Sequence, residues 1–265
     1  MRIATWNINS LNVRLERVEA WIKENEPDVL VLQETKCTDA AFPHGAFSLL
    51  GYESAHHGNG RWNGVAILSR IGLADVVAGF PDEHSGPETE TRLIRARCGS
   101  VVVVCVYVPN GRSVGSEHYE AKLRFLERLV SYVSSIAPAS AEVLVCGDFN
   151  VAPTDSDVFD PSFFEGSTHV TRAEREAVRQ LLDLGFDDSF RTQYPDQGGV
   201  FSWWDYRAGD FHNGRGMRID LMLASHPLAS RIQWALIDRN ARKGQGSKTE
   251  PQPSDHAPVI LQFAD

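Results

Sequence analysis

Hydrophobic positions along the chain fall into two spacings, one typical of strands and one typical of helices. The run Val29-Leu30-Val31-Leu32 is continuous, as expected of a strand that is buried on both faces. Other continuous or alternating runs predict further strands. The predicted strands cover residues 2–7, 29–32, 64–68, 92–97, 101–108, 143–146, 218–223, 232–237 and 259–263.

Three segments repeat apolar residues at helical spacing. Residues 14–25 carry such a stripe and end just before Pro27, which stops a helix. Residues 117–136 form the longest stripe, and residues 172–184 form another. Strands, helices and long polar loops follow one another without an internal repeat. We therefore expect residues 1–265 to form a single α/β domain, in which two sheets pack face to face with helices outside.

Composition and charge narrow the class of protein. The chain has 265 residues, 42% of them hydrophobic, which is enough for a substantial core. It contains no apolar run of about 18 residues and does not begin like a signal peptide, so we expect a cytoplasmic protein with no membrane partner. We separately expect a monomer. The net charge of −9 argues against holding nucleic acid by bulk charge alone, but it is compatible with a local basic rim.

The cysteines do not form a metal-binding pattern. Cys37, Cys98, Cys105 and Cys146 lie far apart, with no Cys-x-x-Cys motif and no histidine pair at zinc-finger spacing. Cys105 and Cys146 lie inside apolar runs, which is typical of buried reduced thiols. A structural zinc ion is therefore not expected.

Two loops stand out by their composition. Residues 78–91 are rich in turn-forming and acidic residues. Residues 239–248 lack acidic residues and contain four bases, Arg239, Arg242, Lys243 and Lys248. The second loop is either a solvated surface turn or a rim that contacts phosphate groups, and the sequence leaves both interpretations open.

Polar side chains repeatedly follow the carboxyl ends of the predicted strands. A single Asp or Asn at such a position is usually a turn or cap residue. Repeated instances are harder to explain in this way, because loops beyond strand ends are where a rigid sheet presents polar groups to one site. The residues concerned are Asn7, Asn9, Glu34, Asp148, Asn150, Asp220, Asp255 and His256.

The segment Gly147-Asp148-Phe149-Asn150 indicates how such a site is built. Asp148 and Asn150 are separated by one residue, so their side chains point to the same side of an extended strand. Gly147 allows another backbone or a ligand to approach closely. A histidine such as His256 is usually structural, but paired with Asp220 it could face a phosphate. Hard oxygen ligands without a thiolate cluster favour Mg²⁺ or Mn²⁺ over zinc.

These residues lie in motifs that closely resemble the exonuclease III and AP endonuclease family, within the larger endonuclease/exonuclease/phosphatase superfamily. The resemblance spans nearly the whole chain in family order. It implies a DNase I-like four-layer α/β sandwich, with two packed mixed sheets flanked by helices and the active site at one edge. The matching segments are Thr-Trp-Asn-Ile-Asn-Ser-Leu (5–11), Leu-Gln-Glu-Thr-Lys (32–36), Asn-Gly-Val-Ala-Ile-Leu-Ser-Arg (63–70), Val-Tyr-Val-Pro-Asn-Gly (106–111), Gly-Asp-Phe-Asn-Val-Ala-Pro-Thr (147–154), Arg-Gly-Met-Arg-Ile-Asp (215–220) and Ser-Asp-His-Ala-Pro-Val (254–259).

The resemblance also implies a metal centre and a water-activating group. Glu34 would be the principal ligand of Mg²⁺ (or Mn²⁺), with Asn7 and Asp255 close to the same ion. Asp148 would orient or deprotonate the attacking water, and Asn150 would bind the scissile phosphate. 

Three further residues are assigned catalytic roles by the same resemblance. His256, paired with Asp220, would contact a phosphate oxygen, and Tyr107 would stabilise the transition state or the leaving group. Some family models place a second ion near Asp148, Asn150 and His256. The sequence does not decide between one ion and two.

Substrate recognition is implied by the segments around the site. Trp203 would line a pocket for an extruded abasic sugar, with Met217 and Ile219 as apolar walls. From the sequence alone, the Trp203-Trp204 pair is more typical of ordinary core, and Met217 leaves the tightness of the pocket open. The candidates for contacts with the DNA backbone are Asn110, Arg61, Arg112, Arg207 and Arg215.

The resemblance thus implies a Mg²⁺-dependent DNA-repair phosphodiesterase. It would cleave double-stranded DNA 5′ to abasic sites and remove nucleotides or blocking groups from 3′ ends, in a balance that the sequence leaves open. One alternative is a phosphoesterase of another superfamily branch, acting on lipid, inositol phosphate or RNA, but no lipid-facing apolar loop is evident. Another is a non-catalytic nucleic-acid-binding protein on the same scaffold, which should have lost part of the metal and base set that is complete here.

Overall fold

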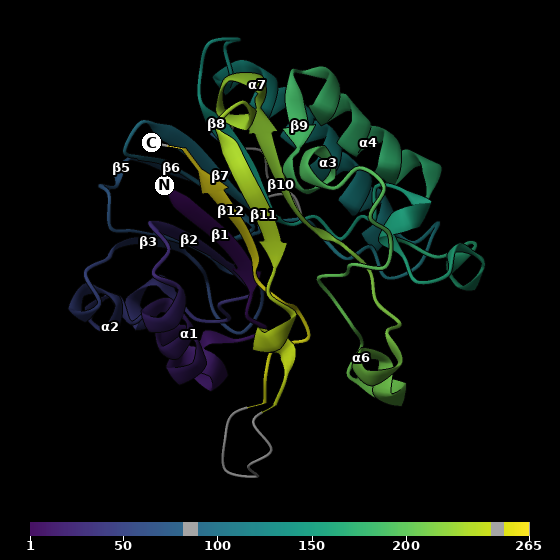
Figure 1. The fold of residues 1–265 in the computed structure, drawn as a ribbon, viewed down its shortest axis with the longest axis horizontal. Helices are drawn as coiled ribbons and strands as arrows, with labels where there is room; N and C mark the ends of the chain where they lie inside the picture. Colours follow the sequence, from purple (N-terminus) through teal and green to yellow (C-terminus); the bar gives the residue numbers. More distant parts are fainter. Residues whose placement is uncertain (82–89, 245–251, 265) are drawn as a thin grey trace.

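The computed structural model describes residues 1–81, 90–244 and 252–264, and its strands form two six-stranded sheets (Figure 1). The first sheet has the order β11-β12-β1-β2-β4-β3, with β1 (Arg2–Asn7), β2 (Val29–Gln33), β3 (Glu53–His57), β4 (Val65–Ser69), β11 (Ile232–Ile237) and β12 (Val259–Phe263). The second has the order β5-β6-β7-β8-β10-β9, with β5 (Ala74–Ala78), β6 (Leu93–Cys98), β7 (Val101–Tyr107), β8 (Val143–Asp148), β9 (Phe186–Asp188) and β10 (Asp220–Ser225).

Each sheet is mixed and has one parallel pair at its centre. These pairs are β1 with β2 and β7 with β8, whereas the other neighbours are antiparallel. The carboxyl ends of two parallel neighbours meet at the same edge of their sheet. Each sheet therefore presents two strand ends side by side.

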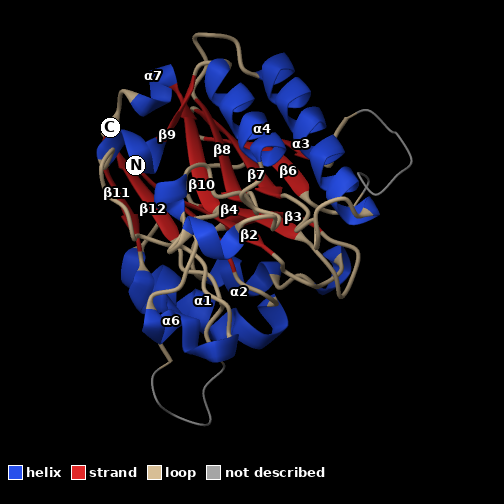
Figure 2. Cartoon of the chain, turned by 90° about the vertical axis from the view of Figure 1, so that its right-hand side faces the viewer, coloured by secondary structure: helices blue, strands red, loops and turns tan. Residues whose placement is uncertain are grey.

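Helices α1 (Leu11–Asn25) and α2 (His44–Leu49) cover the outer face of the first sheet, and α3 (Glu117–Ile136) and α4 (Arg172–Asp183) cover that of the second, which gives four layers (Figure 2). The shorter helices α5 (Ser189–Gln193), α6 (Asp210–Asn213) and α7 (His226–Ala229) contribute side chains to the core between the sheets. One apolar cluster fills the space between the sheets. A second joins α1 and α2 to the first sheet, and a third joins α3 and α4 to the second sheet. The predicted four-layer sandwich is confirmed.

The apolar patterns located the central elements well. The structure reproduces the predicted bounds of β1, α3, β11 and β12, and the other predicted elements overlap their observed counterparts. Helix α1 begins at Leu11 rather than at residue 14. Strand β10 begins at Asp220 rather than at residue 218, because the backbone N–H of Arg218 donates to the Asp157 carbonyl outside the ladder. Strands β3, β5 and β9 were not predicted.

The structure describes only parts of the two loops that were singled out by their composition, residues 78–91 and 239–248. Residues 82–89 of the acidic loop and Lys248 of the basic loop lie outside the described residues. Arg239–Arg242 form a 3₁₀ turn, in which Arg239 is exposed and Arg242 is buried. The burial of Arg242 does not fit the interpretation of this loop as a solvated surface turn. No helix in the described part of the chain is both long enough and apolar enough to cross a membrane.

Candidate active site

The predicted polar residues meet at the edge where the carboxyl ends of both parallel pairs lie. Asn7 ends β1 and Glu34 follows β2, so the first sheet contributes this pair. Tyr107 and Asp148 end β7 and β8 and are register partners, and Asp220 at the start of β10 is paired with Asp148 from the other side. The second sheet contributes these three side chains.

Two hydrogen bonds join the contributions of the two sheets. Asn7 Nδ2 donates to Asp148 Oδ2 at 2.9 Å and also to Glu34 Oε1 at 2.9 Å. His256, in the segment before β12, places Nδ1 2.8 Å from Asp220 Oδ2. The site is therefore assembled across the interface between the sheets.

His256 lies between two buried carboxylates. Its Nδ1 contacts Asp220, and its Nε2 is 3.8 Å from Asp148 Oδ2. Burial opposes the charged form of the imidazole, but the carboxylates of Asp220 and Asp148 prevail and raise the pKa of His256 to about 10. Burial, together with the negative charge of Asp220, raises the pKa of Asp148 to about 7, against the attraction of His256. The three side chains thus form a charge-coupled row with His256 protonated.

Glu34 and Asp255 are linked through a lysine and an amide. Lys36 Nζ lies 2.8 Å from Glu34 Oε2 and 2.6 Å from Asn9 Oδ1, and Asn9 Nδ2 donates to Asp255 Oδ1 at 3.0 Å. Although burial opposes ionisation, Lys36 and Asn7 lower the pKa of Glu34. Glu34 is therefore ionised, and Glu34 and Asp255 lie on either side of a position that already holds a positive group.

The chemistry of these donors fits a hard divalent cation. Within the described residues, a second group of candidate ligands is Asp148, Asp220 and His256, whose carboxylate and imidazole atoms lie within 4.8 Å of one another. Asp220 Oδ1 is buried and has no hydrogen-bond partner there, so a ligand position is unused. The four cysteines are buried and unpaired, and none belongs to this group. Carboxylate oxygens without thiolates suit Mg²⁺ or Mn²⁺.

Tyr107 stands beside these carboxylates. Burial and the negative charge of Glu34 raise the pKa of its hydroxyl well above the ordinary value, so the phenol keeps its proton. The Arg92 guanidinium stacks over the Tyr107 ring at 4.5 Å, and Arg92 Nη1 donates to the Tyr107 carbonyl. The ring is thereby fixed as a neutral donor next to Glu34 and Asp148.

Asn150 is held by its neighbours on both sides of the amide. Nδ2 donates to the Val108 carbonyl at 3.0 Å, which leaves its second hydrogen for a ligand. Oδ1 lies 3.3 Å from Asn110 Nδ2 and 3.1 Å from His169 Nε2. His169 was not predicted from the sequence, because it follows no predicted strand.

A buried ion pair supports Asn110 and Asn150 from behind. Lys122 on α3 and Glu174 on α4 are in contact, with both side chains 0% exposed. Lys122 Nζ also donates to the carbonyls of Asn150 at 2.6 Å and of Asn110 at 3.3 Å. Glu174 accepts from the His169 N–H at 2.9 Å. We call this pair the Lys122–Glu174 hub, because it joins two helices to three loops of the site.

A second support holds the segment that carries Asp255 and His256. Arg14 on α1 is 6% exposed and donates to the carbonyls of Asn9 and Gln252 and to the Tyr206 hydroxyl. Tyr206 in turn donates to the Pro253 carbonyl at 2.7 Å. The sequence pattern placed Arg14 at the start of a helix and gave no indication of this role.

The predicted substrate wall adjoins the site. Trp203 Nε1 donates to Asp255 Oδ2 at 3.2 Å, and its backbone is bridged to Met217 and to His256. Met217 and Ile219 are almost fully buried in a small apolar cluster against which Trp203 packs. Met217 and Ile219 therefore pack against Trp203 and expose almost no surface of their own.

Most of the residues predicted to contact the DNA backbone lie on exposed loops. Asn110 is exposed and contacts Asn150, as described above. Arg61, Arg112 and Arg207 are exposed on loops, and Arg207 pairs with Asp205. Arg215 is half-buried and pairs with Asp210 at 2.7 Å. Of these residues, the structure thus brings Asn110 into contact with Asn150.

The backbone of the site is held in uncommon conformations. Asn9, Glu34, Lys36 and Asn150 all have φ between 45° and 54°. Non-glycine residues rarely adopt this left-handed region, and such positions cluster at functional sites. Gly147 has φ 141°, and a Cβ there would lie 2.0 Å from the Val106 carbonyl oxygen. The close approach of β7 and β8 next to Asp148 therefore requires glycine.

The chain is similar to known proteins over nearly its full length. A model of the endonuclease/exonuclease/phosphatase family matches residues 4–256. Exodeoxyribonuclease III of Haemophilus influenzae is 34% identical over 274 aligned positions, which cover 99% of this chain and 100% of that protein. An AP endonuclease from Archaeoglobus fulgidus has a structure similar at a TM-score of 0.93 and 37% identity, over 100% of both chains. A 3′ phosphatase from Neisseria, solved with a product DNA hairpin, gives 0.93 and 36%, also over 100% of both chains.

These matches show that the chain belongs to the endonuclease/exonuclease/phosphatase family. Within that family it is an enzyme of the exodeoxyribonuclease III and AP endonuclease type.

Proposed function

We propose that the chain uses Mg²⁺ (or Mn²⁺) to hydrolyse double-stranded DNA 5′ to abasic sites and to remove nucleotides or blocking groups from 3′ ends. Its family makes it a DNA-repair nuclease, and the substrates and the metal are inferred from the site. The observation that carries the proposal is the buried row of Asp148, His256 and Asp220, which is set across the two sheets.

Asp148 is suited to activate the attacking water. It is 1% exposed, and its two oxygens are fixed by the amide of Asn7 and the backbone N–H of Asn150. A buried carboxylate held in this way can orient a water molecule and accept its proton as the oxygen attacks phosphorus. His256 beside it offers a positive charge to a phosphate oxygen, with Asp220 fixing the ring from Nδ1.

The remaining groups are placed to stabilise charge on the phosphate and on the departing 3′ oxygen. Asn150 has a free amide hydrogen, and the protonated Tyr107 hydroxyl can donate a hydrogen bond. Donors fixed before reaction stabilise developing negative charge without having to reorganise. 

The metal ion would be held by Glu34 and Asp255, close to Asn7. When bound, such an ion supplies Lewis-acid stabilisation of the phosphoryl oxygens. The Lys36 ammonium lies among these same groups, which supports a preference for positive charge at this position. Asp220 Oδ1, which has no hydrogen-bond partner among the described residues, would be a further oxygen ligand for a metal ion.

Selection of abasic sites would rest on Trp203, backed by Met217 and Ile219. Flipping out a nucleotide is least costly where the base is already missing, so a small apolar pocket selects such lesions. The two structural relatives described above include an AP endonuclease and a 3′ phosphatase, which supports both kinds of substrate.

The test compares two duplexes, one with a tetrahydrofuran abasic analogue and one with a recessed 3′ end. We expect cleavage of at least one of them with Mg²⁺, and loss of cleavage when the metal is chelated. Asp148→Asn should be inactive, whereas Asp75→Asn, which changes an exposed acid on β5, should cleave like the unaltered protein. Failure of the folded, metal-supplied protein on both duplexes would refute the proposed function.

A further inference from the structure

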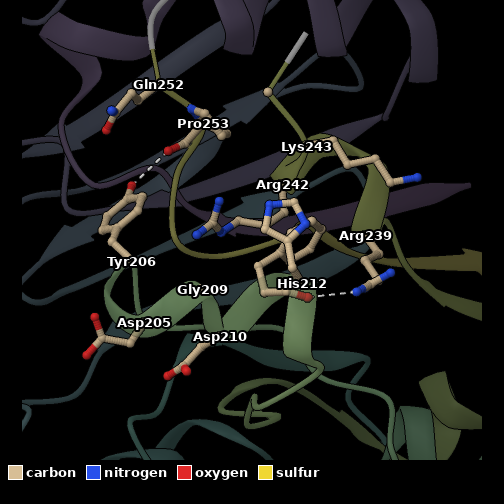
Figure 3. Close-up of a pocket in the computed structure, with 12 residues that line it drawn as sticks. Asp205, Tyr206, Gly209, Asp210, His212, Arg239, Arg242, Lys243, Gln252 and Pro253 are labelled. Atoms are coloured by element: carbon tan, nitrogen blue, oxygen red, sulfur yellow. Dashed lines mark hydrogen bonds between the residues drawn. The ribbon is translucent and has the colours of Figure 1, made fainter. Parts of the chain in front are cut away.

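A cavity of about 670 Å³ lies outside the catalytic row, between the Arg239–Arg242 turn and α6 (Figure 3). We call it the cationic pocket. Its lining includes Arg239, Arg242, Lys243, His212, Tyr206 and Pro253. Pro253 is followed by the segment that carries Asp255 and His256, so this wall continues into the catalytic edge.

The acids of the pocket are already paired, whereas the bases are not. Asp205 pairs with Arg207 at 3.0 Å, and Asp210 pairs with Arg215 at 2.7 Å. Within the described residues, no carboxylate lies within ion-pair distance of Arg239, Arg242 or Lys243. Among the described residues, a chain with net charge −9 thus gathers three bases that have no ion-paired carboxylate in one concave place.

Arg242 is the most informative of these bases. It is 8% exposed, and its Nε has no hydrogen-bond partner among the described residues. Its guanidinium stacks on Tyr206 at 4.9 Å and on Phe211 at 5.1 Å, and Figure 3 shows its side chain reaching toward the Tyr206 ring. Stacking fixes the plane of a guanidinium and leaves its N–H edge for an acceptor.

A second buried arginine shows what is absent around Arg242. Arg218 is 1% exposed and lies between Asp157 and Asp188, with bonds of 2.7 Å to each. Burial opposes its charge, but the two carboxylates raise the pKa of Arg218, whereas burial lowers the pKa of Arg242. A buried charge is normally compensated by a partner. An anionic ligand would supply that partner for Arg242.

We propose that the cationic pocket binds one phosphate group of the DNA substrate, at a distance from the phosphate that is cleaved. Guanidinium and ammonium groups bind phosphate oxygens through charge-assisted hydrogen bonds. Because the pocket adjoins the segment that carries Asp255 and His256, a duplex bound in the active site would supply this phosphate from another point of its backbone. This source of the phosphate rests on the proposed function. Free phosphate has the same chemistry and is the alternative occupant to be distinguished.

The first experiment neutralises the mouth of the pocket. Arg239→Gln/Lys243→Gln changes two exposed residues and leaves the buried Arg242 in place. The matched control is Lys23→Gln/Arg128→Gln, since Arg128 stacks on Phe80 at 4.5 Å just as Arg239 stacks on Phe211 at 4.5 Å. Both variants lose two positive charges, in an Asp148→Asn background that prevents cleavage.

The measured quantity is the slope of the logarithm of DNA affinity against the logarithm of salt concentration. Loss of one phosphate contact should flatten this slope by about 1 in the pocket variant and leave it unchanged in the control. Equal slopes in the two variants would overturn the proposal that DNA occupies the pocket.

The second experiment uses inorganic phosphate and metal-free protein, with the His212 ring signal followed by NMR. A saturable shift that is absent from the pocket variant is expected. If the shift occurs without a change in the DNA slope, the pocket binds free phosphate and the DNA assignment is wrong. If neither effect occurs, the pocket binds no phosphate. Because this titration needs no turnover, failure of DNA cleavage would refute the proposed function and leave the phosphate result standing.

Discussion

Removal of one partner of the Lys122–Glu174 hub should destabilise the protein strongly. In Lys122→Met, the carboxylate of Glu174 stays buried without its ammonium partner, since both side chains are 0% exposed. Breaking a buried pair in this way costs about 3–5 kcal/mol. A folded domain has about 5–15 kcal/mol in total, so the variant should fold but with much less stability.

A double-mutant cycle separates the free-energy cost of the unpaired buried charge from the effect of changing side-chain size. Glu174→Gln leaves the Lys122 charge without its ionised partner, and the loss of stability should be of similar size. In Lys122→Met/Glu174→Gln no charge remains buried at the hub, so the loss should be smaller than the sum of the two single losses. Urea unfolding curves give each free energy from the midpoint and slope.

Catalysis should respond as well, because Lys122 Nζ binds the carbonyls of Asn150 and Asn110. We expect single-turnover cleavage by Lys122→Met to slow, even at temperatures where the variant is folded, and DNA affinity to change less than the rate. A loss of stability below about 1 kcal/mol for Lys122→Met, or strictly additive losses in the cycle, would refute the role assigned to the hub.

Three further outcomes are expected. Asp148→Asn should lower the cleavage rate by about 100- to 10,000-fold while DNA binding persists, as measured by single-turnover kinetics and anisotropy. Gly147→Ala should lower the urea midpoint and activity together, because its Cβ would lie 2.0 Å from the Val106 oxygen. Stability should fall as pH drops from about 6.5 toward 4, since burial lowers the pKa of His56 to about 4 and the unfolded chain binds that proton first. His56→Gln should reduce this fall, measured by urea unfolding at each pH.

Each of these outcomes can fail in a definite way. Equal losses of DNA affinity and rate in Asp148→Asn would assign the carboxylate to substrate positioning. An unchanged urea midpoint in Gly147→Ala would show that β7 and β8 can separate at this point without cost. Identical pH profiles for His56→Gln and the unaltered protein would place the acid sensitivity in other groups.

The sequence predicted the centre of the fold better than its borders. Strands such as β2 and β8 are buried on both faces and therefore appear as continuous apolar runs. The three strands that were not predicted, β3, β5 and β9, all lie at sheet edges. Most side chains of these strands are only partly buried, so no long apolar run predicts them. Their sequences are Glu-Ser-Ala-His-His, Ala-Asp-Val-Val-Ala and Phe-Asp-Asp.

The same contrast holds for the site. Strand-end groups such as Asp148 could be predicted because they come directly after a short apolar run in the sequence. Lys122, Glu174 and Arg14 could not, because they reach the site from helices and bind backbone groups of its loops: Lys122 and Arg14 donate to carbonyls, and Glu174 accepts from an N–H. The signal in hindsight is a lysine among the buried residues of α3, next to Phe125 and Leu126, where an apolar residue would be expected.

The division of the site between the two sheets has a consequence for folding. The groups expected to hold the metal come from the first sheet or the segment entering it, whereas Asp148, Asn150 and Asp220 come from the second, and Asn7–Asp148 and His256–Asp220 are the bonds that join them. A folding intermediate with only one sheet formed would hold half of the array. Recovery of activity during refolding should therefore report the docking of the two sheets, and should lag behind the formation of either sheet alone.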